Sequence, residues 1–314
     1  MTGSGGELRP IVAVVGATAT GKTELAEALA EALDGEVVCA DSRQVFRELE
    51  IGTGKPDPVA RRARPHHLFD VRALEEPTSA GWYADACRTT CDAIHGRGRV
   101  PVLVGGSGLY LRAAQRGLAR APAIPNAVRA RVRASLAADG AEPLHRRLAD
   151  VDPDTAARLS PRDGQRIARA LEVWEASGRT LAWWHAHAAA RPAHAAWRVI
   201  GLELPPAVLA ARIAARTRQM FAAGLIEETA ALLAADRGQA LAALRAIGYD
   251  EAMAHLAGRL AWAEAVERTS ARTRQLAKRQ RTWFRHQIDA RAVDAGRSAA
   301  ERLAESLRVA RGRP

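Results

Sequence analysis

Short apolar runs alternate with helical patterns over the first part of this chain. The runs at 11–15, 36–40 and 100–104 consist almost entirely of apolar residues, as parallel strands buried on both faces do. Between them, apolar residues recur at helical spacing, as in the helix expected at 79–95. This alternation predicts an α/β fold, a nucleotide-binding-type core built on a doubly wound parallel sheet.

The pattern changes after about residue 120, where strand signals disappear and Arg, Ala, Asp and Trp dominate. One helix is expected to begin after Asp163 and to end at Gly178, with apolar residues at helical spacing at Ile167, Leu171 and Trp174. A further strand is expected at 197–202, and helices are expected from there to the end of the chain. The chain therefore reads as an α/β core interrupted by helices.

These patterns predict two domains. The core is expected to consist of residues 1–120 and 198–314, and residues 121–197 are expected to form an all-helical insertion. The 314 residues, 48% of them apolar, are enough for a sizeable core, and no apolar run approaches a membrane span. Residues 1–10 lack the apolar segment of a secretory signal.

The number and spacing of the cysteines indicate the cellular compartment. Three cysteines at these spacings are too few for a disulfide framework, which favours a reducing cytoplasm; they are Cys39, Cys87 and Cys91. Cys87 and Cys91 lie four residues apart on an expected helix, and we interpret them as helix-core residues rather than metal ligands.

One segment has recognisable chemistry, because it fits the phosphate-binding pattern G-x-x-x-x-G-K-[ST]. It consists of Gly16, Ala17, Thr18, Ala19, Thr20, Gly21, Lys22 and Thr23. An expected strand precedes it and an expected helix follows it, so backbone N–H groups and the helix dipole would attract anions. Lys22 would reach a terminal phosphate, and the Thr23 hydroxyl would hold Mg²⁺. The agreement of the flanking elements makes a chance match the weaker interpretation.

Two polar residues follow the next expected strands. Asp41 comes directly after 36–40, and Ser107 follows 100–104. Ligands of open α/β sheets bind beyond the carboxyl ends of the strands, so both side chains are expected to face the phosphate loop. Asp41 would order Mg²⁺ or accept a proton, unless it caps a following helix, and Ser107 would bind the same ligand or form a turn. No acidic residue ends the strand at 100–104, which disfavours an ordinary NTP-driven motor.

The charge balance points to a polyanionic partner. Lys and Arg total 46 against 35 Asp and Glu, a formal net charge of +11, although part of the arginine excess reflects general composition. Near the C-terminus one helical face collects Arg274, Lys278, Arg281 and Arg285, while Leu276 and Trp283 share another face that would pack. This arrangement favours contact with RNA over an ordinary solvated face.

In combination, these motifs resemble those of the tRNA dimethylallyltransferases. Asp41-Ser42-Arg43-Gln44 is similar to the family's D-S-x-Q, and residues 51–56 are close to I-G-T-x-K-P. Residues 66–70 are similar to H-H-L-[IL]-D, and residues 105–110 to G-G-T-x-L-Y. The matches follow the family's order from residue 11 to residue 286. Ala17 replaces a proline of the family's phosphate loop, and Ser107 replaces a threonine but keeps the hydroxyl.

The resemblance implies transfer of a dimethylallyl group from dimethylallyl diphosphate to the exocyclic amine of the tRNA adenine adjacent to the anticodon on its 3′ side. Asp41 would be the general base, and Ser107 would orient the amine or the base. Mg²⁺, Lys22 and Arg216 would stabilise the leaving diphosphate, with Arg218 as the alternative arginine. The loop would hold a diphosphate rather than a nucleotide, so no ATP hydrolysis is expected.

The resemblance also implies tRNA contacts. The positions that match are Asp41, Ser42, Arg43, Gln44, Ser107, Arg129, Gln165, Arg166, Ile167, Ala168 and Arg169. The expected partners are the anticodon stem-loop and dimethylallyl diphosphate, with no membrane, and the expected state is a monomer. An isopentenyltransferase acting on free adenine nucleotides shares the chemistry, but the insertion and the basic terminal helix count against it. A small-metabolite kinase and an RNA-binding module with an inactive loop are further alternatives.

Overall fold

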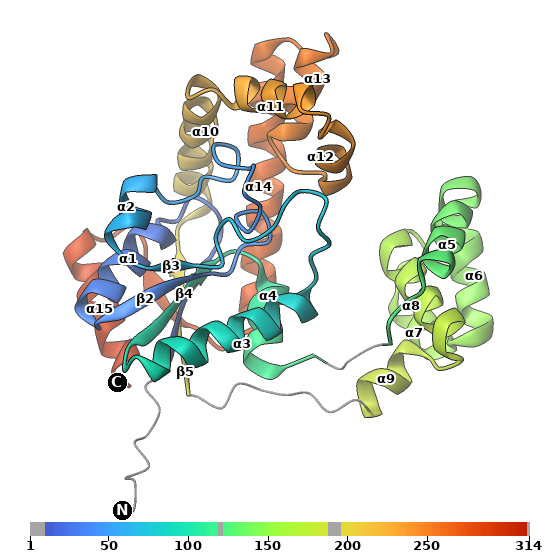
Figure 1. Cartoon of the computed structure of the whole chain (residues 1–314), viewed down its shortest axis with the longest axis horizontal. Coiled ribbons are helices and arrows are strands. Elements are labelled where there is room, and N and C mark those ends of the chain that lie inside the picture. Colours follow the sequence, from blue (N-terminus) through green and yellow to red (C-terminus); the bar gives the residue numbers. More distant parts are fainter. Residues whose placement is uncertain (1–9, 119–121, 188–195, 313–314) are drawn as a thin grey trace, which may run out of the picture. The chain divides into compact units, whose positions relative to one another are not determined.

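The computed structural model describes residues 10–118, 122–187 and 196–312 (Figure 1). The chain divides into two compact units. The larger unit consists of residues 1–115 and 193–314, and the smaller unit consists of residues 116–192. The larger unit contains a sheet covered by helices, whereas the described residues of the smaller unit form helices alone.

Within the described residues, the strands of the larger unit are β1 (Ile11–Gly16), β2 (Gly35–Cys39), β3 (His66–His67), β4 (Val100–Gly105), β5 (Trp197–Glu203) and β6 (Arg291–Asp294). They form one six-stranded sheet in the order β3-β2-β4-β1-β5-β6, and every neighbouring pair is parallel. In the central register, Val14 pairs with Val104 on one side and with Ile200 on the other. The predicted parallel sheet and its four predicted strands are confirmed.

Two strands of the sheet were not predicted from the sequence. The expectation that only helices follow the strand at 197–202 is wrong, because β6 pairs with β5 after the long helix. Only Val293 of this edge strand is buried, so the segment lacks the apolar run that marks a buried strand. The strand β3 has two residues, His66 and His67, which is too short for any periodicity.

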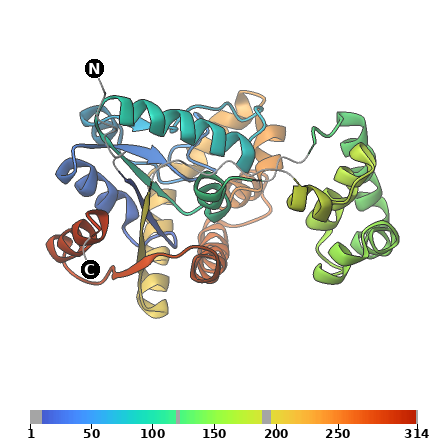
Figure 2. The ribbon, with the colours of Figure 1, turned by 90° about the horizontal axis from the view of Figure 1, so that it is seen from below.

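Helices cover both faces of the sheet, as Figure 2 shows. One face packs against α1 (Lys22–Ala32) and α15 (Ala299–Ala310), with residues such as Val12 and Val14 pointing that way. The other face packs against α3 (Ala80–Gly96), α4 (Gly108–Arg116) and the end of α14 (Trp262–Gln287). Alternate residues of β1 pack into the hydrophobic cores on the two faces of the sheet, because successive side chains of a strand point to opposite faces.

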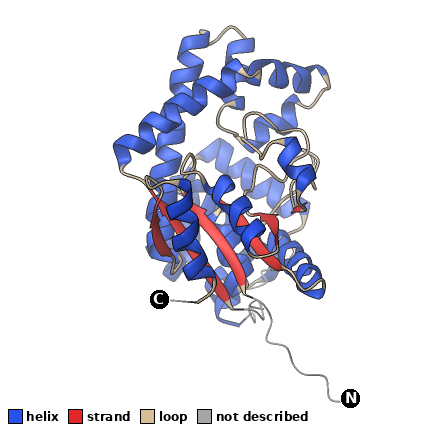
Figure 3. Cartoon of the chain, turned by 90° about the vertical axis from the view of Figure 1, so that its left-hand side faces the viewer, coloured by secondary structure: helices blue, strands red, loops and turns tan. Residues whose placement is uncertain are grey.

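Further helices lie beyond the sheet, as Figure 3 shows. They are α10 (Pro206–Ala222), α11 (Leu225–Ala234), α12 (Gly238–Leu244) and α13 (Tyr249–Leu256), which pack with the first part of α14. The short helix α2 (Pro58–Ala63) precedes β3. None of the helices in the described residues combines the length and apolar character needed to cross a membrane.

The smaller unit packs around its own core. Its helices are α5 (Asn126–Asp139), α6 (Ala141–Val151), α7 (Pro153–Arg158), α8 (Gly164–Ser177) and α9 (Leu181–His187). The Asp163 carboxylate accepts a hydrogen bond from Arg166 N at 3.2 Å, and Gly178 has a φ of 64°, so the predicted ends of this helix are confirmed. Ile167 and Leu171 lie in the core of this unit.

The cysteines of α3 are core residues. Cys87 and Cys91 lie one turn apart, both are buried, and their Sγ atoms are 3.9 Å apart. No group of three or more His, Cys, Asp or Glu in the described residues is arranged to hold a metal ion. Because both cysteines belong to the buried core beneath α3, their interpretation as helix-core residues is confirmed.

Candidate active site

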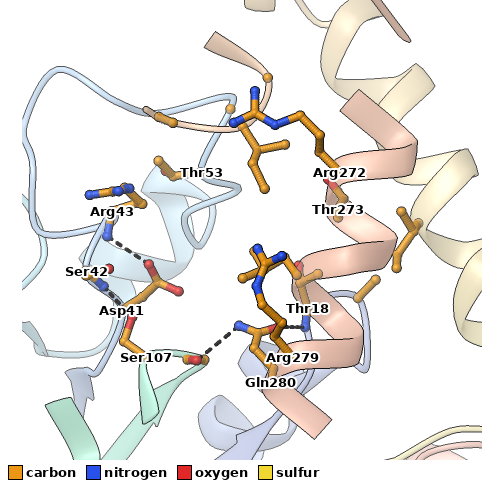
Figure 4. A pocket seen from close by; sticks show the side chains of 18 of the residues that line it. Thr18, Asp41, Ser42, Arg43, Thr53, Ser107, Arg272, Thr273, Arg279 and Gln280 are labelled. Atoms are coloured by element: carbon orange, nitrogen blue, oxygen red, sulfur yellow. Dashed lines mark hydrogen bonds between the residues drawn. The ribbon is translucent and has the colours of Figure 1, made fainter. Parts of the chain in front are cut away.

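The segments that follow β1, β2 and β4 meet at one pocket of about 820 Å³ in the larger unit. These strands are neighbours in the sheet, so their carboxyl ends lie side by side. Thr18 and Ala19 of the phosphate loop, Asp41 and Ser107 all line the pocket. Figure 4 shows Asp41 and Ser107 on one wall and Thr18 on the facing wall, next to residues of α14. The structure thus brings the three predicted segments together.

The phosphate loop has a backbone that demands glycine at two places. Gly16 and Gly21 have φ values of 144° and 87°, and a Cβ on residue 16 would lie 2.6 Å from the carbonyl oxygen of Leu202. Ala19 also has a positive φ, at 63°. Such a backbone turns successive N–H groups toward one side, which is the arrangement that binds phosphate at a helix N-terminus.

The hydrogen bonds of the loop leave part of it free for a ligand. The N–H groups of residues 19–21 have no hydrogen-bond partner within the described part of the chain, whereas the N–H of Thr18 donates to Gln280 Oε1 at 3.0 Å. Free N–H groups that open onto a helix start, here α1, attract an anion.

Lys22 is half-buried beside the loop. Its Nζ donates to the carbonyl oxygen of Ala17 at 2.6 Å, and Thr20 Oγ1 donates to the same oxygen at 2.9 Å. Burial lowers the pKa of Lys22 to about 8; the nearby Asp41 carboxylate opposes this shift and the Arg216 guanidinium adds to it. The three charged groups are thus close enough to influence one another, although Lys22 is not a lining residue of the pocket. A bound phosphate would give Lys22 an anionic partner.

Asp41 presents one free carboxylate oxygen to the pocket. Its Oδ1 accepts from Arg43 N at 2.9 Å, and its Oδ2 accepts no hydrogen bond from the described residues. The segment after Asp41 forms turns, not a helix, so the helix-cap interpretation is wrong. Ser107 Oγ accepts from Ser42 N at 2.8 Å, which leaves the hydroxyl proton available for a ligand.

Arg216 of α10 lies against the loop that contains Gly54. Its Nη2 donates to the carbonyl oxygen of Gly54 at 3.3 Å, and burial lowers its pKa. The Gln44 amide donates to Thr53 O and Gly54 O, both at 3.1 Å, so it points into this loop and does not line the pocket. Arg43 lines the pocket, and its Nη2 donates to Leu244 O at 2.7 Å.

The same loop is anchored from the helical layer. Glu228 accepts from Ile51 N at 2.9 Å and from the Tyr249 hydroxyl at 2.5 Å. That hydroxyl in turn accepts from Gly52 N at 3.1 Å. Because Tyr249 is fully buried, the loop that supports Arg216 is held by groups with little freedom to move.

Part of the pocket lining is apolar. Residues of α10, α11, α13 and α14 line it, together with the segment before α13; they include Ile213, Met220, Leu225, Ile247, Tyr249 and Leu276. A ligand that fills the whole pocket therefore needs an anionic end and a small hydrocarbon end.

Comparisons with known proteins agree with this geometry. The IPP transferase family model matches residues 44–287. A tRNA dimethylallyltransferase of Halorhodospira halophila is 46% identical over 286 residues, covering 89% of this chain and 91% of that protein. Another, from Methylococcus capsulatus, is 42% identical over 311 residues and covers 98% of this chain and 99% of that protein. This chain belongs to the tRNA dimethylallyltransferase family.

A solved structure of the family has the same fold. The full-length tRNA isopentenylpyrophosphate transferase from Bacillus halodurans superimposes with a TM-score of 0.66 at 33% identity, covering 96% of this chain and 99% of that chain. The family model begins at Gln44, so the phosphate loop lies before the matched range, but the relatives of comparable length span it.

Two motifs of the tRNA dimethylallyltransferase family are in direct contact in the structure. Lys55, from the I-G-T-x-K-P segment, forms an ion pair with Asp70, from the H-H-L-x-D segment. The Lys55 side chain is fully buried and also donates to Phe46 O at 2.7 Å. Arg61 pairs with Asp70 as well. Together these charges fix the loop that follows Asp41, so the two motifs serve the site by positioning it.

The structure distinguishes the two candidate arginines for the diphosphate. Arg216 lines the pocket and lies near Lys22 and Asp41, whereas Arg218 is exposed and is not a lining residue. The two are two residues apart on α10, so they point to different sides of the helix.

The long helix α14 presents two faces. The pocket face carries Arg272, Thr273, Leu276, Arg279, Gln280 and Trp283. The predicted cationic face lies on the other side, because residues of an α-helix turn by about 100° per position; it comprises Arg274, Lys278, Arg281 and Arg285. Trp283 packs against the core as expected, and Leu276 and Trp283 also line the pocket.

Sequence reasoning missed the two pocket arginines of α14. Arg272 donates to Glu251 at 2.5 Å and to Asp250 at 2.9 Å, which fixes it on the wall, while Arg279 makes no ion pair in the described residues. Their positions on the helical wheel, next to Leu276, could have predicted that they share its face. The prediction of RNA contact considered only the opposite face, which carries more cations.

The predicted tRNA contacts of the helical insertion divide by burial. Gln165 and Arg166 are exposed, and Arg169 is half-buried beside Glu172. Arg129, on α5, is also half-buried. In contrast, Ile167 and Ala168 are buried in the core of the smaller unit, at 0% and 5% exposure, so their side chains pack and are unavailable to RNA.

Proposed function

We propose that this tRNA dimethylallyltransferase moves a dimethylallyl group from dimethylallyl diphosphate to the exocyclic amine of the tRNA adenine next to the anticodon on its 3′ side. The observation that carries the proposal is the shared pocket. A carboxylate with a free oxygen, Asp41, lines the same pocket as Arg216 and the phosphate-loop residues Thr18 and Ala19. Lys22 of that loop lies close enough for both charges to influence its pKa. Anion binding and proton removal are the two functions this transfer requires.

The cationic side of the pocket serves the leaving group. When the allylic C–O bond breaks, its electron pair stays on the diphosphate, and nearby positive charge stabilises the product. Lys22, Arg216 and the free N–H groups of residues 19–21 supply that charge before the reaction begins. Diphosphate binding would replace the contact of Lys22 with the neutral carbonyl of Ala17 by a contact with an anionic oxygen.

Asp41 is the proposed general base. As the bond from the adenine nitrogen to the allylic carbon forms, a proton must leave that nitrogen, and Asp41 Oδ2 accepts it. The Ser107 hydroxyl, whose oxygen is held by Ser42 N, donates toward the reacting groups and orients them. Positioned proton transfer of this kind contributes ~10²–10⁴ in rate.

The apolar end of the pocket holds the hydrocarbon. Side chains such as Ile213, Met220 and Leu276 supply apolar surface to the pocket, which suits a five-carbon tail and would keep water from the allylic centre.

Mg²⁺ fits the residues at the start of α1. Thr23 supplies a hydroxyl that makes no hydrogen bond within the described residues. Mg²⁺ takes most of its ligands from water and substrate phosphates, so a single hydroxyl from the protein suits it. When bound, Mg²⁺ would neutralise charge on the diphosphate. Lys22 and Arg216 bind the same group from the protein side.

Both units of the chain contribute to the proposed tRNA binding. In the smaller unit, Arg129, Gln165, Arg166 and Arg169 would contact the anticodon stem, mainly through phosphates. Ser42 and Arg43 would contact the reactive base, which must leave its stack to reach Asp41. The cationic face of α14 would add phosphate contacts, so affinity would fall with rising salt.

The expected state is a cytoplasmic monomer. The three cysteines are free and buried, which is compatible with a reducing compartment. Sedimentation of the purified protein with and without tRNA tests the monomeric state.

The decisive experiment incubates labelled dimethylallyl diphosphate with unmodified tRNA and compares wild type with Asp41→Asn. We expect label in the tRNA with the wild type, at least a ~10²-fold lower turnover with the variant, and unchanged tRNA binding. Asparagine keeps the size and the contact to Arg43 N, so a loss reports on the base. Equal turnover would remove Asp41 from the mechanism.

Two parallel assays separate the alternatives. AMP as acceptor tests the isopentenyltransferase of free nucleotides, and labelled ATP with tRNA tests a kinase or an ATPase. We expect neither reaction to approach the rate with tRNA and dimethylallyl diphosphate. Label transfer to AMP at the tRNA rate would contradict the proposed acceptor.

A further inference from the structure

Gln280 of α14 joins the two loops that border the anion site. Its Oε1 accepts from Thr18 N at 3.0 Å, and its Nε2 donates to the carbonyl oxygen of Gly106 at 3.0 Å. Figure 4 shows both contacts on the pocket wall opposite Asp41. The amide thus uses a donor and an acceptor at once, which fixes its orientation.

The fit of this side chain is close. A Cβ on residue 106 would lie 2.3 Å from Gln280 Nε2, so the amide lies directly on the glycine backbone. Gln280 also lines the pocket, next to Thr18. A ligand that extends past Thr18 therefore meets the amide of Gln280.

The contact with Thr18 divides the phosphate loop into a free and an occupied part. The N–H groups of residues 19–21, beside the start of α1, are free, but the N–H of Thr18, farther from that helix, is already bonded. In phosphate loops that hold a nucleoside triphosphate, the loop N–H groups and the lysine bind a chain of three phosphates. Here the N–H of Thr18 is not available to a phosphate, because it already donates to Gln280.

We propose that Gln280 limits the anion site to two phosphates and so makes it select a diphosphate ester over a nucleoside triphosphate. The inference rests on the proposed function, because it assumes that the prenyl diphosphate binds at this loop. A third phosphate would have to displace the Gln280 amide and break its hydrogen bonds to Thr18 and Gly106. The diphosphate binds the free part of the loop without that loss.

The test measures a ratio of affinities. Inorganic pyrophosphate and tripolyphosphate, each with Mg²⁺, are titrated calorimetrically into wild type, Gln280→Ala and Gln280→Glu. We expect wild type to favour pyrophosphate and Gln280→Ala to lose about tenfold of that preference, which is the effect of one charge-assisted hydrogen bond gained by the longer anion. Gln280→Glu keeps an acceptor for Thr18 N–H and adds negative charge, so its preference for pyrophosphate should equal or exceed that of wild type.

The controls separate selectivity from loss of structure. Gln219→Ala removes an exposed glutamine of α10 outside the pocket and should leave both affinities unchanged. A role in loop stability alone would weaken both anions together and leave their ratio constant in Gln280→Ala. That result, or a parallel change of the ratio in Gln280→Glu, would overturn the proposal. Absence of prenyl transfer by wild type would instead count against the proposed function.

Discussion

The Arg216 guanidinium lies directly on the backbone of Gly54. Arg216 Nη2 donates to Gly54 O at 3.3 Å, and a Cβ on residue 54 would lie 1.8 Å from the same nitrogen. Gly54 also has a φ of 58°, which side-chain-bearing residues rarely adopt. A loop glycine far from α10 in sequence therefore determines where the arginine proposed for the diphosphate can be.

Gly54→Ala should displace Arg216 and raise the KM for dimethylallyl diphosphate. We expect an increase of about tenfold or more, the effect of moving a charged hydrogen-bond donor, with the melting temperature lowered by only a few degrees. Steady-state kinetics at saturating tRNA measure the change. Gly258→Ala, at another positive-φ glycine with open space around it, serves as the control for backbone strain alone. An equal KM in both alanine variants would contradict the role of Gly54.

Arg216→Ala and Arg218→Ala should have very different effects on kcat/KM. Arg216 lines the pocket and Arg218 does not, so removal of Arg216 should lower kcat/KM by about 10²-fold or more, while removal of Arg218 should change it less than threefold. Initial rates at varied dimethylallyl diphosphate give both values. A larger loss with Arg218→Ala would reassign the diphosphate contact to Arg218.

Diphosphate affinity should fall above pH 8. Burial lowers the pKa of Lys22 to about 8 in the free protein, so the ammonium that binds the anion is present below this pH and is lost above it. A bound diphosphate favours the protonated form, so binding above pH 8 takes up a proton, and affinity should decline up to about tenfold per pH unit.

Calorimetry with dimethylallyl diphosphate between pH 7 and 9.5 measures this dependence. Buffers of different ionisation enthalpy report the proton uptake directly. Lys22→Met should bind weakly at every pH and without proton uptake in this range. Constant wild-type affinity from pH 7 to 9.5 would show that Lys22 stays protonated and would contradict the lowered pKa.

Glu36 should support the fold at neutral pH and lose this role in acid. Its side chain is 2% exposed, and hydrogen bonds from Arg97, helped by His67, lower its pKa to about 2 from the usual 4.5. Because the folded pKa is the lower one, this stabilisation is complete above pH 4.5 and disappears as the pH falls toward 2. The shift corresponds to at most about 3 kcal/mol, since Arg97 is half-exposed and solvent screens the pair.

Urea unfolding of wild type and Glu36→Gln checks this expectation. The variant should be less stable by about 1–3 kcal/mol at pH 7, and the difference should stay constant to pH 5 and narrow below pH 4.5. A difference that grows in acid would reverse the sign and contradict a lowered pKa. Glu305→Gln, at a partly exposed ion pair with Arg297, should show a much smaller effect.

Local sequence patterns were enough to predict many of the secondary-structure elements and the phosphate loop of this protein. The buried strands, the phosphate loop and the helix between Asp163 and Gly178 each depend on neighbouring residues, so periodicity and capping chemistry identify them. The meeting of the loop with Asp41 and Ser107 also followed, since parallel strands place their carboxyl ends together. The two-residue β3 and the half-polar β6 gave no such pattern, because their pairing is a property of the sheet edge.

Only the tertiary structure decided which side chains reach the pocket. The sequence placed cations on α14, but the packing of that helix placed Arg272, Arg279 and Gln280 at the pocket and left the denser cationic face out of the pocket lining. The support of Arg216 by Gly54 and the bridge from Gln280 to Thr18 join segments more than 160 residues apart. Periodicity fixes which residues share a face of a helix, but the direction of that face depends on contacts with distant segments, which no local pattern contains.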